Sequence, residues 1–332
     1  MSKKLRIGGA SGFWGDSVIA TPQLLNGNDL DFIVYDYLAE ITMSIMARAR
    51  AKDATKGYAV DFVSSVLKLN LRQIADQKVK ILSNAGGVNP EACAEAIREL
   101  IKELKLDLKV SVVLGDDLMR EKNKFSELNT KEMYSNEDFP AEDKIASINA
   151  YLGAFPIAEA LKSGADIVIT GRSVDSAVTL GACIYAFGWN EKEYDKLAAG
   201  SLAGHIIECG TQSTGGNFTD WELVSKDLHQ IGYPIVEVSE DGSFDCTKSK
   251  NSTGMVSFGT VAEQMLYEIG DPQAYILPDV ICDFSNVKIE ETEKDKVKIS
   301  GAKGYPAPNQ YKVCATYADG FRAGHVLSLI HI

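Results

Sequence analysis

The sequence predicts an α/β fold, in which a mostly parallel sheet with helices on both faces is followed by a smaller β-rich (α+β) region. Short apolar strands alternate with helical stretches through the first half of the chain, which is typical of βαβ units. After about residue 230 the pattern changes to strand pairs around tight turns. A length of 332 residues favours two domains. We therefore expect an α/β ligand-binding domain over 1–231 and a β-rich domain over 232–326.

The elements of the first region are expected from apolar runs that end at small polar residues, and from helix start and stop signals. Asn89 and Ser173 are expected to be N-caps, and Gly188 is expected to end a helix. The polar, charge-rich stretch 119–143 is expected to be an excursion or lid outside the core. Strands are expected at 5–8, 32–35, 79–83, 110–114 and 165–170, and helices at 38–50, 90–104, 145–162 and 174–187.

The β-rich region shows a hairpin signal at Asp241-Gly242, between apolar runs on either side. A second strand pair is expected at 287–290 and 297–300, and a single strand at 311–317. The last six residues, 327–332, match one reading frame of a sequencing-library adapter. We therefore expect a non-native tail there, and an incomplete β-rich domain before it.

Composition excludes several classes of protein. There are 34 Lys and Arg against 46 Asp and Glu, a net charge of −12, so nucleic acid is not an expected partner. No apolar stretch approaches the roughly 20 residues of a membrane span, and no export signal precedes the first strand. The six cysteines are scattered, which fits a reducing, cytoplasmic compartment. Neither His nor Cys clusters, so no zinc site is expected.

Three expected strand ends share one design, in which a strand runs through a small polar loop into a helix. In a parallel sheet such loops lie together at the carboxyl edge, where open α/β folds bind ligands. Arg172 supplies a fixed positive charge suited to a carboxylate or phosphate. The alternative is that these loops are tight turns without a ligand. The candidate binding residues are Gly9, Ser11, Gly12 and Gly15, then Asn84, Gly86, Gly87 and Asn89, then Gly171 and Asp175.

The first loop also has the spacing of a dinucleotide fingerprint. Gly9, Gly12 and Gly15 follow a strand, and Asp36 ends the next strand, where it could bind a ribose. Two bulky aromatic residues inside the loop and Pro22 in the following helix count against this interpretation. NAD(P) is therefore a disfavoured cofactor that the sequence leaves open.

The segment from 200 to 221 is the richest in chemistry. His205, Glu208 and Cys209 are the candidate acid, base and nucleophile, although His205 and Cys209 share a face only if this stretch is helical. The alternative is a core thiol and a structural histidine. The loop that follows is crowded with donors that could hold a carboxylate, phosphate or thioester oxygen. Its candidate binding residues are Thr211, Ser213, Gly215, Gly216 and Asn217.

Acidic residues at another strand end raise the question of a metal. Asp116 and Asp117 could bind a hard cation together with Asp36 or Asp175. Paired acids after a strand are more often solvated turn residues, so no metal site is predicted.

Six segments together resemble the acyclic terpene utilisation (AtuA) family. They are 7–16, 83–90, 164–177, 203–221, 232–238 and 311–324. The resemblance implies a place in the bacterial breakdown of citronellol- and geraniol-type terpenes, which proceeds through acyl-CoA thioesters. It leaves the reaction open, and the substrate need not be a terpene. Family members are longer than this chain, which agrees with an incomplete C-terminal region.

The favoured hypothesis is an enzyme that performs a hydratase, lyase or isomerase step on a branched acyl-CoA or carboxylate. Arg172 and the backbone of 215–217 would hold oxyanions, while Glu208 or His205 moves a proton. One alternative is a non-catalytic subunit that binds an acyl-CoA or a partner enzyme. A weaker alternative is an NAD(P)-dependent oxidoreductase. Assembly into a homo-oligomer or with a partner enzyme stays open.

Overall fold

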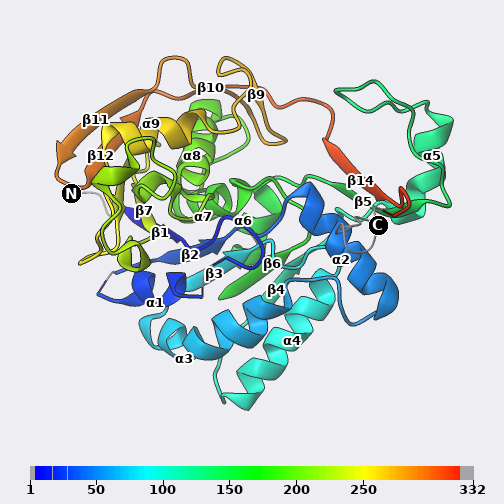
Figure 1. Cartoon of the computed structure of the whole chain (residues 1–332), viewed down its shortest axis with the longest axis horizontal. Coiled ribbons are helices and arrows are strands. Elements are labelled where there is room, and N and C mark those ends of the chain that lie inside the picture. The colour runs from blue at the N-terminus through cyan, green and yellow to red at the C-terminus, as the bar shows by residue number, and fades with distance from the viewer. Residues whose placement is uncertain (1–3, 17, 28, 322–332) are drawn as a thin grey trace, which may run out of the picture.

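The computed structural model describes residues 4–16, 18–27 and 29–321, and within them a nine-stranded sheet forms the centre of the molecule (Figure 1). In spatial order its strands are β11 (Lys288–Glu293), β12 (Lys296–Ser300), β8 (Phe244–Lys248), β7 (Pro234–Val238), β1 (Leu5–Gly9), β2 (Phe32–Tyr35), β3 (Lys80–Ser83), β6 (Ile167–Thr170) and β4 (Val110–Val113). The five strands from β1 to β4 in this order are parallel. The other four pair antiparallel, and β7 joins the two parts of the sheet. The predicted α/β class is confirmed.

Helices cover both faces of the parallel part because each strand alternates its apolar side chains between two cores. Ile33 and Ile81 belong to one core, whereas Phe32 and Leu82 belong to the other. Burying one such side chain stabilises the fold by roughly 1.5–3 kcal/mol. The first core includes α1 (Ala20–Leu25), α2 (Glu40–Lys52), the π-helix Phe62–Leu67, α3 (Lys68–Gln77) and α4 (Pro90–Glu103), and the second includes α6 (Phe155–Lys162), α7 (Ala177–Phe187), α8 (Tyr194–Ile207) and α9 (Phe258–Leu266).

The β-rich region continues the same sheet. Strand β7 pairs antiparallel with β1, from Leu5 opposite Val238 to Gly8 opposite Ile235. The predicted hairpin at Asp241-Gly242 is confirmed as β7–β8, and Gly242 takes the positive φ of 90° that the turn requires. The second predicted pair is confirmed as β11–β12. The boundary expected at 231–232 therefore falls just before a strand of the shared sheet.

The helix predicted over 145–162 is wrong in its first half. Residues Ile145–Ala150 form β5, and the helix α6 begins only at Phe155. Strand β5 pairs antiparallel with β14 (Val313–Tyr317), and the hydroxyls of Ser147 and Thr316 bond across the pair at 2.6 Å. Such a partner, far away in the sequence, overrides a local helical preference.

Of the two predicted helix caps, Asn89 is confirmed as the N-cap residue of α4, without a capping bond from its side chain, and Ser173 is corrected. Asn89 precedes α4, but its side chain donates to the carbonyls of Ala54 and Lys56 at 2.9 and 2.8 Å, so it ties down a neighbouring loop instead. Ser173 does not start a helix, because α7 begins at Ala177. Ser173 forms a bridge with Leu152, which holds the preceding turn in an extended form.

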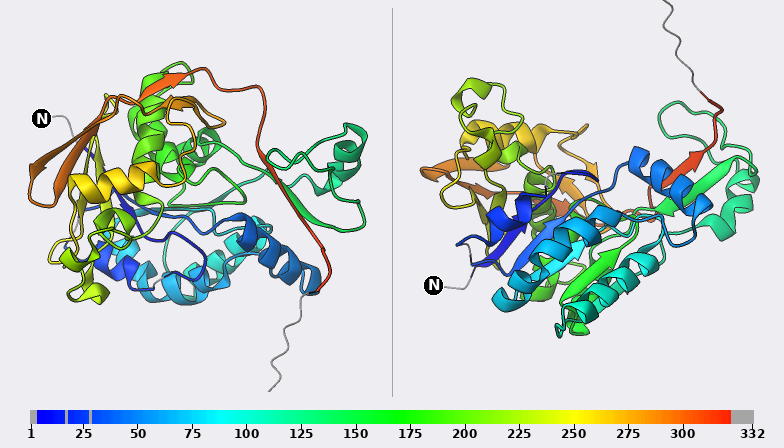
Figure 2. Two further views of the ribbon diagram at one scale, coloured as in Figure 1. Left: turned by 45° about the horizontal axis from the view of Figure 1, so that its top comes forward. Right: turned by 60° about the horizontal axis from the view of Figure 1, so that its bottom comes forward.

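The stretch 119–143 lies outside the core, as predicted. It contains a short 3-10 turn, Met119–Glu121, and α5 (Lys122–Glu127), neither of which has a buried residue. With the β5–β14 pair it lies to one side of the main body (Figure 2). A further small sheet, β13 (Lys303–Tyr305), β10 (Ile281–Asp283) and β9 (Tyr275–Ile276), packs against α8. Among the described residues no helix has the length and apolar character needed to cross a membrane.

Candidate functional site

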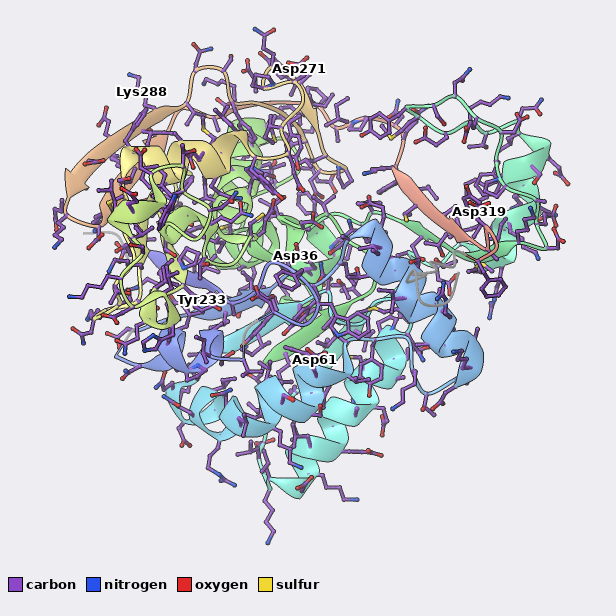
Figure 3. All side chains as sticks on the ribbon, in the orientation of Figure 1. Asp36, Asp61, Tyr233, Asp271, Lys288 and Asp319 are labelled. Atoms are coloured by element: carbon purple, nitrogen blue, oxygen red, sulfur yellow. The ribbon has the colours of Figure 1, made fainter. Side chains whose placement is uncertain are left out.

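The loops after the parallel strands meet at the carboxyl edge of the sheet, as the sequence predicted. The hydroxyl of Ser11, after β1, donates to the carbonyl of Asp36, after β2, at 2.9 Å. Asn84, after β3, donates through its amide to the Asp36 carboxylate and accepts from the backbone N–H of Tyr37 at 2.8 Å. Figure 3 shows Asp36 near the middle of the molecule. Three strand ends are thus joined around one buried carboxyl group.

The carboxyl group of Asp36 is held in an unusual electrostatic environment. Burial raises its pKa, and the nearby carboxylates of Asp175 and Glu208 raise it further. Arg172 and the amide of Asn84 lower it in part, but the pKa of Asp36 remains well above its usual value. The site therefore gathers acidic groups from three segments around a single guanidinium.

Arg172 is buried, and its guanidinium is already engaged by the protein. It donates to the carbonyl of Leu38 and to the Asp175 carboxylate, both at 2.8 Å, and lies 4.1 Å from the centre of the Tyr151 ring. Its Nε has no hydrogen-bond partner among the described residues. Burial lowers the pKa of Arg172, but the charge of Asp175 and the contact with Tyr151 more than offset this effect. The positive charge of Arg172 is therefore compensated by the Asp175 carboxylate within the site.

Asp116 supports the turn that carries Arg172. Its carboxylate accepts from the backbone N–H of Arg172 and from the Asn149 amide, both at 2.8 Å. A Cβ on Gly171 would lie 2.4 Å from the same carboxylate, so glycine is required there. Burial raises the pKa of Asp116. Within the described ranges, no three His, Cys, Asp or Glu side chains form a group that could hold a metal ion.

His205 and Glu208 form a buried acid–base pair where α8 ends. The Nδ1 of His205 lies 2.7 Å from Oε1 of Glu208, and the two residues are 1% and 7% exposed. Neither His205 Nε2 nor Glu208 Oε2 has a hydrogen-bond partner in the described part of the chain. Such free polar atoms in a buried pair are uncommon and are a feature of reactive sites.

Each member of this pair shifts the pKa of the other. Burial lowers the pKa of His205, but the charge and hydrogen bond of Glu208 outweigh burial and raise it. Burial raises the pKa of Glu208, and His205 opposes that shift only in part. Glu208 thus favours the protonated imidazole, and the backbone of Gln264 and Met265 raises the pKa of His205 in the same direction.

Cys209 follows Glu208 directly in the chain, but its surroundings do not activate the thiol as the nucleophile hypothesis requires. Helix α8 ends at Ile207, so the helical face that would align Cys209 with His205 is not formed. Burial raises the pKa of the half-buried thiol, and the carboxylates of Glu208 and Asp36 raise it further. A thiol held protonated in this way is a weak nucleophile.

The glycines of the first loop allow it to pack against the segment after α8. A Cβ on Gly9 would lie 2.2 Å from the carbonyl oxygen of Ile207, and one on Gly12 would lie 2.8 Å from the carbonyl carbon of Cys209. The N–H of Gly12 donates to Asp16 at 2.9 Å. Gly15 has a φ of 90°, with open space around it. Close packing of protein on protein thus accounts for Gly9 and Gly12.

Asn84 is the residue of the second loop that reaches the cluster, and its glycines serve packing. A Cβ on Gly86 would lie 2.4 Å from the carbonyl oxygen of Thr170. Gly87 has a φ of 54°, and a Cβ there would lie 2.2 Å from the sulfur of Met46. The loop therefore packs tightly between β6 and α2.

The donors of the 210–217 loop are directed to the loop itself and to the antiparallel half. Thr214 donates to the carbonyls of Thr211 and Gly232, at 2.9 and 2.7 Å. A Cβ on Gly216 would lie 2.3 Å from the Thr211 hydroxyl, and Gly215 has a φ of 106°. Ser213 is buried, whereas Asn217 is exposed. The structure shows no hydrogen bond from these described residues to the His205–Glu208 pair.

Two residues of the site were not expected from the sequence. The Gln264 amide, on α9, donates to the His205 carbonyl at 2.8 Å. The Tyr275 ring, on β9, lies 6.1 Å from the His205 ring between centroids, at an angle of 52°. Both come from the region expected to form a separate domain. A single Gln and a single Tyr without a motif offered no signal.

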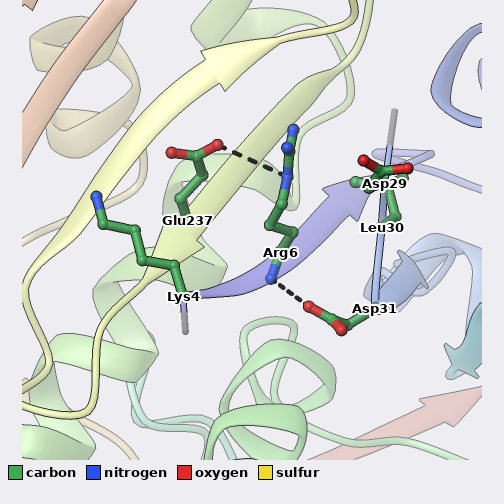
Figure 4. A pocket seen from close by; sticks show the side chains of 6 residues that line it. All are labelled: Lys4, Arg6, Asp29, Leu30, Asp31 and Glu237. Carbon is green, nitrogen blue, oxygen red and sulfur yellow. Dashed lines mark hydrogen bonds and ion pairs between the residues drawn. The ribbon is translucent and has the colours of Figure 1, made fainter. Parts of the chain in front are cut away.

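A surface depression lies at the opposite edge of the sheet, near the amino ends of β1 and β2 (Figure 4). Arg6 pairs there with Glu237 at 3.6 Å, and the backbone N–H of Arg6 donates to Asp31 at 2.9 Å. The depression lies at the other end of the strands from the carboxyl-edge loops. We assign it no role.

Comparison with known proteins gives one match. Residues 5–331 match the family described as acyclic terpene utilisation family protein AtuA. No curated protein and no solved structure matches the chain. The segment 327–332, expected to be a non-native tail, lies outside the described residues. Because the match covers nearly the whole sequence, the chain belongs to the acyclic terpene utilisation (AtuA) family.

Proposed function

We propose that the protein is an enzyme of acyclic terpene or branched acyl-CoA catabolism, in which His205 and Glu208 act as an acid–base pair. The substrate class is a branched acyl-CoA or related carboxylate, and the reaction is a hydratase, lyase or isomerase step. The observation that carries the proposal is the buried 2.7 Å pair at the carboxyl edge of a parallel sheet, where open α/β folds bind ligands. Family membership supports the pathway.

The geometry suits proton transfer at one atom. The hydrogen bond from Nδ1 to Glu208 orients the imidazole and leaves Nε2 to accept a proton. That proton would come from water or from the carbon next to a thioester carbonyl. Glu208 then stabilises the imidazolium that forms, which is how a carboxylate partner strengthens a histidine base.

Arg172 has a different role in this proposal from the one the sequence suggested. Its charge is compensated by Asp175, and its hydrogen bonds hold the Leu38 carbonyl. We infer that Arg172 is a positioning residue, which fixes the loops after β2 and β6 around the acid–base pair.

The burial of the pair supports a second candidate, a non-catalytic acyl-CoA-binding subunit. His205 and Glu208 are 1% and 7% exposed, so a substrate reaches them only if the surrounding segments move. An NAD(P)-dependent oxidoreductase has less support, because protein backbone lies against the Cβ positions of Gly9 and Gly12.

The test is whether the full chain turns over branched enoyl-CoA and 3-hydroxyacyl-CoA substrates. Mass spectrometry of the products detects gain or loss of water, isomerisation or chain cleavage. His205→Gln is expected to lower kcat by about a hundredfold or more, the usual contribution of a general base. His229→Gln is the matched control, because His229 is exposed and lies outside the site.

Three results are informative. Loss in His205→Gln with an unchanged control supports the proposal. Equal turnover in wild type and His205→Gln contradicts the assignment of the base. Binding of acyl-CoA without turnover of any substrate favours the non-catalytic candidate.

A further inference from the structure

Tyr275 places a phenol beside the acid–base pair, and the mechanism above does not use it. We propose that Tyr275 is a further catalytic residue, whose hydroxyl donates a hydrogen bond to the thioester carbonyl oxygen while His205 moves the proton. This inference rests on the proposed function and deepens it, since it assigns the group that recognises the reacting carbonyl.

The position of the Tyr275 ring is well defined by its neighbours. It lies 6.1 Å from the His205 ring and 5.9 Å from the ring of Phe284, which is itself buried. Strand β9 pairs with β10, where Tyr275 lies opposite Cys282. The phenol is therefore fixed by aromatic packing on one side and by strand pairing on the other, as a preorganised donor must be.

The electrostatic surroundings keep Tyr275 in the form that can donate. Burial raises the pKa of its hydroxyl, and the carboxylates of Glu208 and Asp175 raise it further. The group therefore stays a neutral phenol near neutral pH. The Tyr275 ring itself lies beside the acid–base pair, 6.1 Å from the His205 ring between centroids.

Asp175 and Tyr275 are more exposed than His205. The Asp175 side chain is 33% exposed and Tyr275 is partly exposed, whereas His205 is fully buried. The Tyr275 side chain is therefore more accessible to a thioester from solvent than the His205 imidazole is. We assign the carbonyl to Tyr275 and the reacting carbon or water to His205 on this basis.

The step balances for hydration of an α,β-unsaturated thioester. Water gives a proton to Nε2 of His205, and its oxygen bonds to the β-carbon. The electron pair of the double bond moves to the thioester as an enolate, whose oxygen accepts the hydrogen bond from Tyr275. The proton on His205 then passes to the α-carbon. Tyr275 keeps its own proton throughout, and no further reactant is needed.

The first test is kinetic and uses the full chain. Tyr275→Phe removes the hydroxyl but keeps the ring that packs against His205 and Phe284. Loss of one such donor is expected to lower kcat by about 10²–10³-fold. KM is expected to rise by up to about tenfold, because the ground-state hydrogen bond to the carbonyl is lost. The pH at which kcat rises is expected to change little, since His205 keeps its partner Glu208. Tyr305→Phe is the matched control, because Tyr305 is an exposed tyrosine of the same small sheet.

The second test needs no turnover and compares the binding of a branched acyl-CoA thioester with that of its thioether analogue, which lacks the carbonyl oxygen. Wild type is expected to bind the thioester about tenfold more tightly than the thioether, because one hydrogen bond contributes about that factor to affinity. Tyr275→Phe should lose this preference, and His205→Gln should keep it.

If Tyr275→Phe keeps both its kcat and its preference, the inference is overturned while the proposed function stands. If wild type binds the thioester but His205→Gln keeps full turnover, the proposed base is wrong instead. If wild type binds neither compound, the acyl-CoA function and the role of Tyr275 fall together.

Discussion

Single hydrogen bonds set the chemistry of the site, and the bond between His205 and Glu208 leads to a pH prediction. Nε2 acts as a base only when the imidazole has lost its second proton. Because Glu208 raises the pKa of His205 above the ordinary value of 6.5, kcat should rise with pH along a limb above that value. Glu208→Gln removes the carboxylate from a buried histidine, so the limb should move to lower pH and the maximal kcat should fall.

The measurement is kcat against pH for wild type, Glu208→Gln and the control His229→Gln. The control should follow wild type throughout. An unchanged limb in Glu208→Gln would mean that another group, and not His205, sets the pH dependence.

A second prediction at the residue scale concerns the packing of the first loop. In Gly9→Ala the new methyl group would lie 2.2 Å from the carbonyl oxygen of Ile207, which is backbone and cannot rotate away. We expect a loss of about 1–3 kcal/mol in the free energy of unfolding. Gly270→Ala is the matched control, because a Cβ there meets nothing within 4 Å. Urea unfolding measures both variants, and equal stability in the two would refute the packing argument.

The sequence could predict those site residues whose position follows from the order of strands. Asp36, Asn84 and Arg172 each follow a buried strand, and parallel strands bring such ends together. His205 and Glu208 were found because an imidazole and a carboxylate occur together in one segment that is rich in polar and small residues. Tyr275 and Gln264 could not be found, since long-range packing of β9 and α9 brings them to the site. For the 210–217 loop the binding residues stay a prediction, because the composition of a loop does not show where its donors point.

Among the elements, α6 depends on a side chain that is distant in sequence. Its N-cap residue, Ala154, has no side-chain acceptor, and the Asp279 carboxylate accepts the Ala154 N–H at 2.8 Å instead. Burial raises the pKa of Asp279 from 3.8 to about 6. Between these two pH values the folded state binds a proton that the unfolded state has released. Stability should therefore fall as pH rises from 3.8 to about 6, by up to about 3 kcal/mol.

Asp279→Asn should remove this dependence and keep an acceptor for the Ala154 N–H. Its stability relative to wild type is expected to increase as pH rises across the same window. Urea unfolding at a series of pH values measures the difference, with Asp107→Asn as an exposed control. A difference that stays constant with pH would show that Asp279 does not titrate in this range.

The elements that could be predicted are those whose sequence pattern reflects burial. The strands β1, β2, β3 and β6 are short apolar runs, because helices cover both of their faces. The strand β5 could not be predicted, because its alanines suit a helix and its partner β14 lies far along the chain. The capping bonds at helix starts could not be predicted for a similar reason, because the Asn89 side chain and the Ser173 backbone bond to other segments of the fold.

For the whole molecule, the continuous sheet predicts a single cooperative unit. Strand β7 is hydrogen-bonded on one side to β1 and on the other to β8, and Val236 lies opposite both Ile7 and Cys246. All three side chains are buried in the same core. Opening the antiparallel half would expose this core and leave the edge of β1 unpaired, so both halves should open together.

Native-state hydrogen exchange tests this prediction directly. The amides of β7 are expected to exchange with the same free energy of opening as those of β2 and β3, and to lose protection at the same urea concentration. Separate behaviour of β7, β8, β12 and β11, with a lower free energy of opening, would instead support an independent domain that begins near residue 232. The result also bears on the site, because Gln264, on α9, and Tyr275, on β9 of the small sheet, reach His205 from the part of the chain that follows β8. If the amides of α9 and β9 open together with the large sheet, these residues and the acid–base pair are held in one arrangement, which a preorganised donor requires.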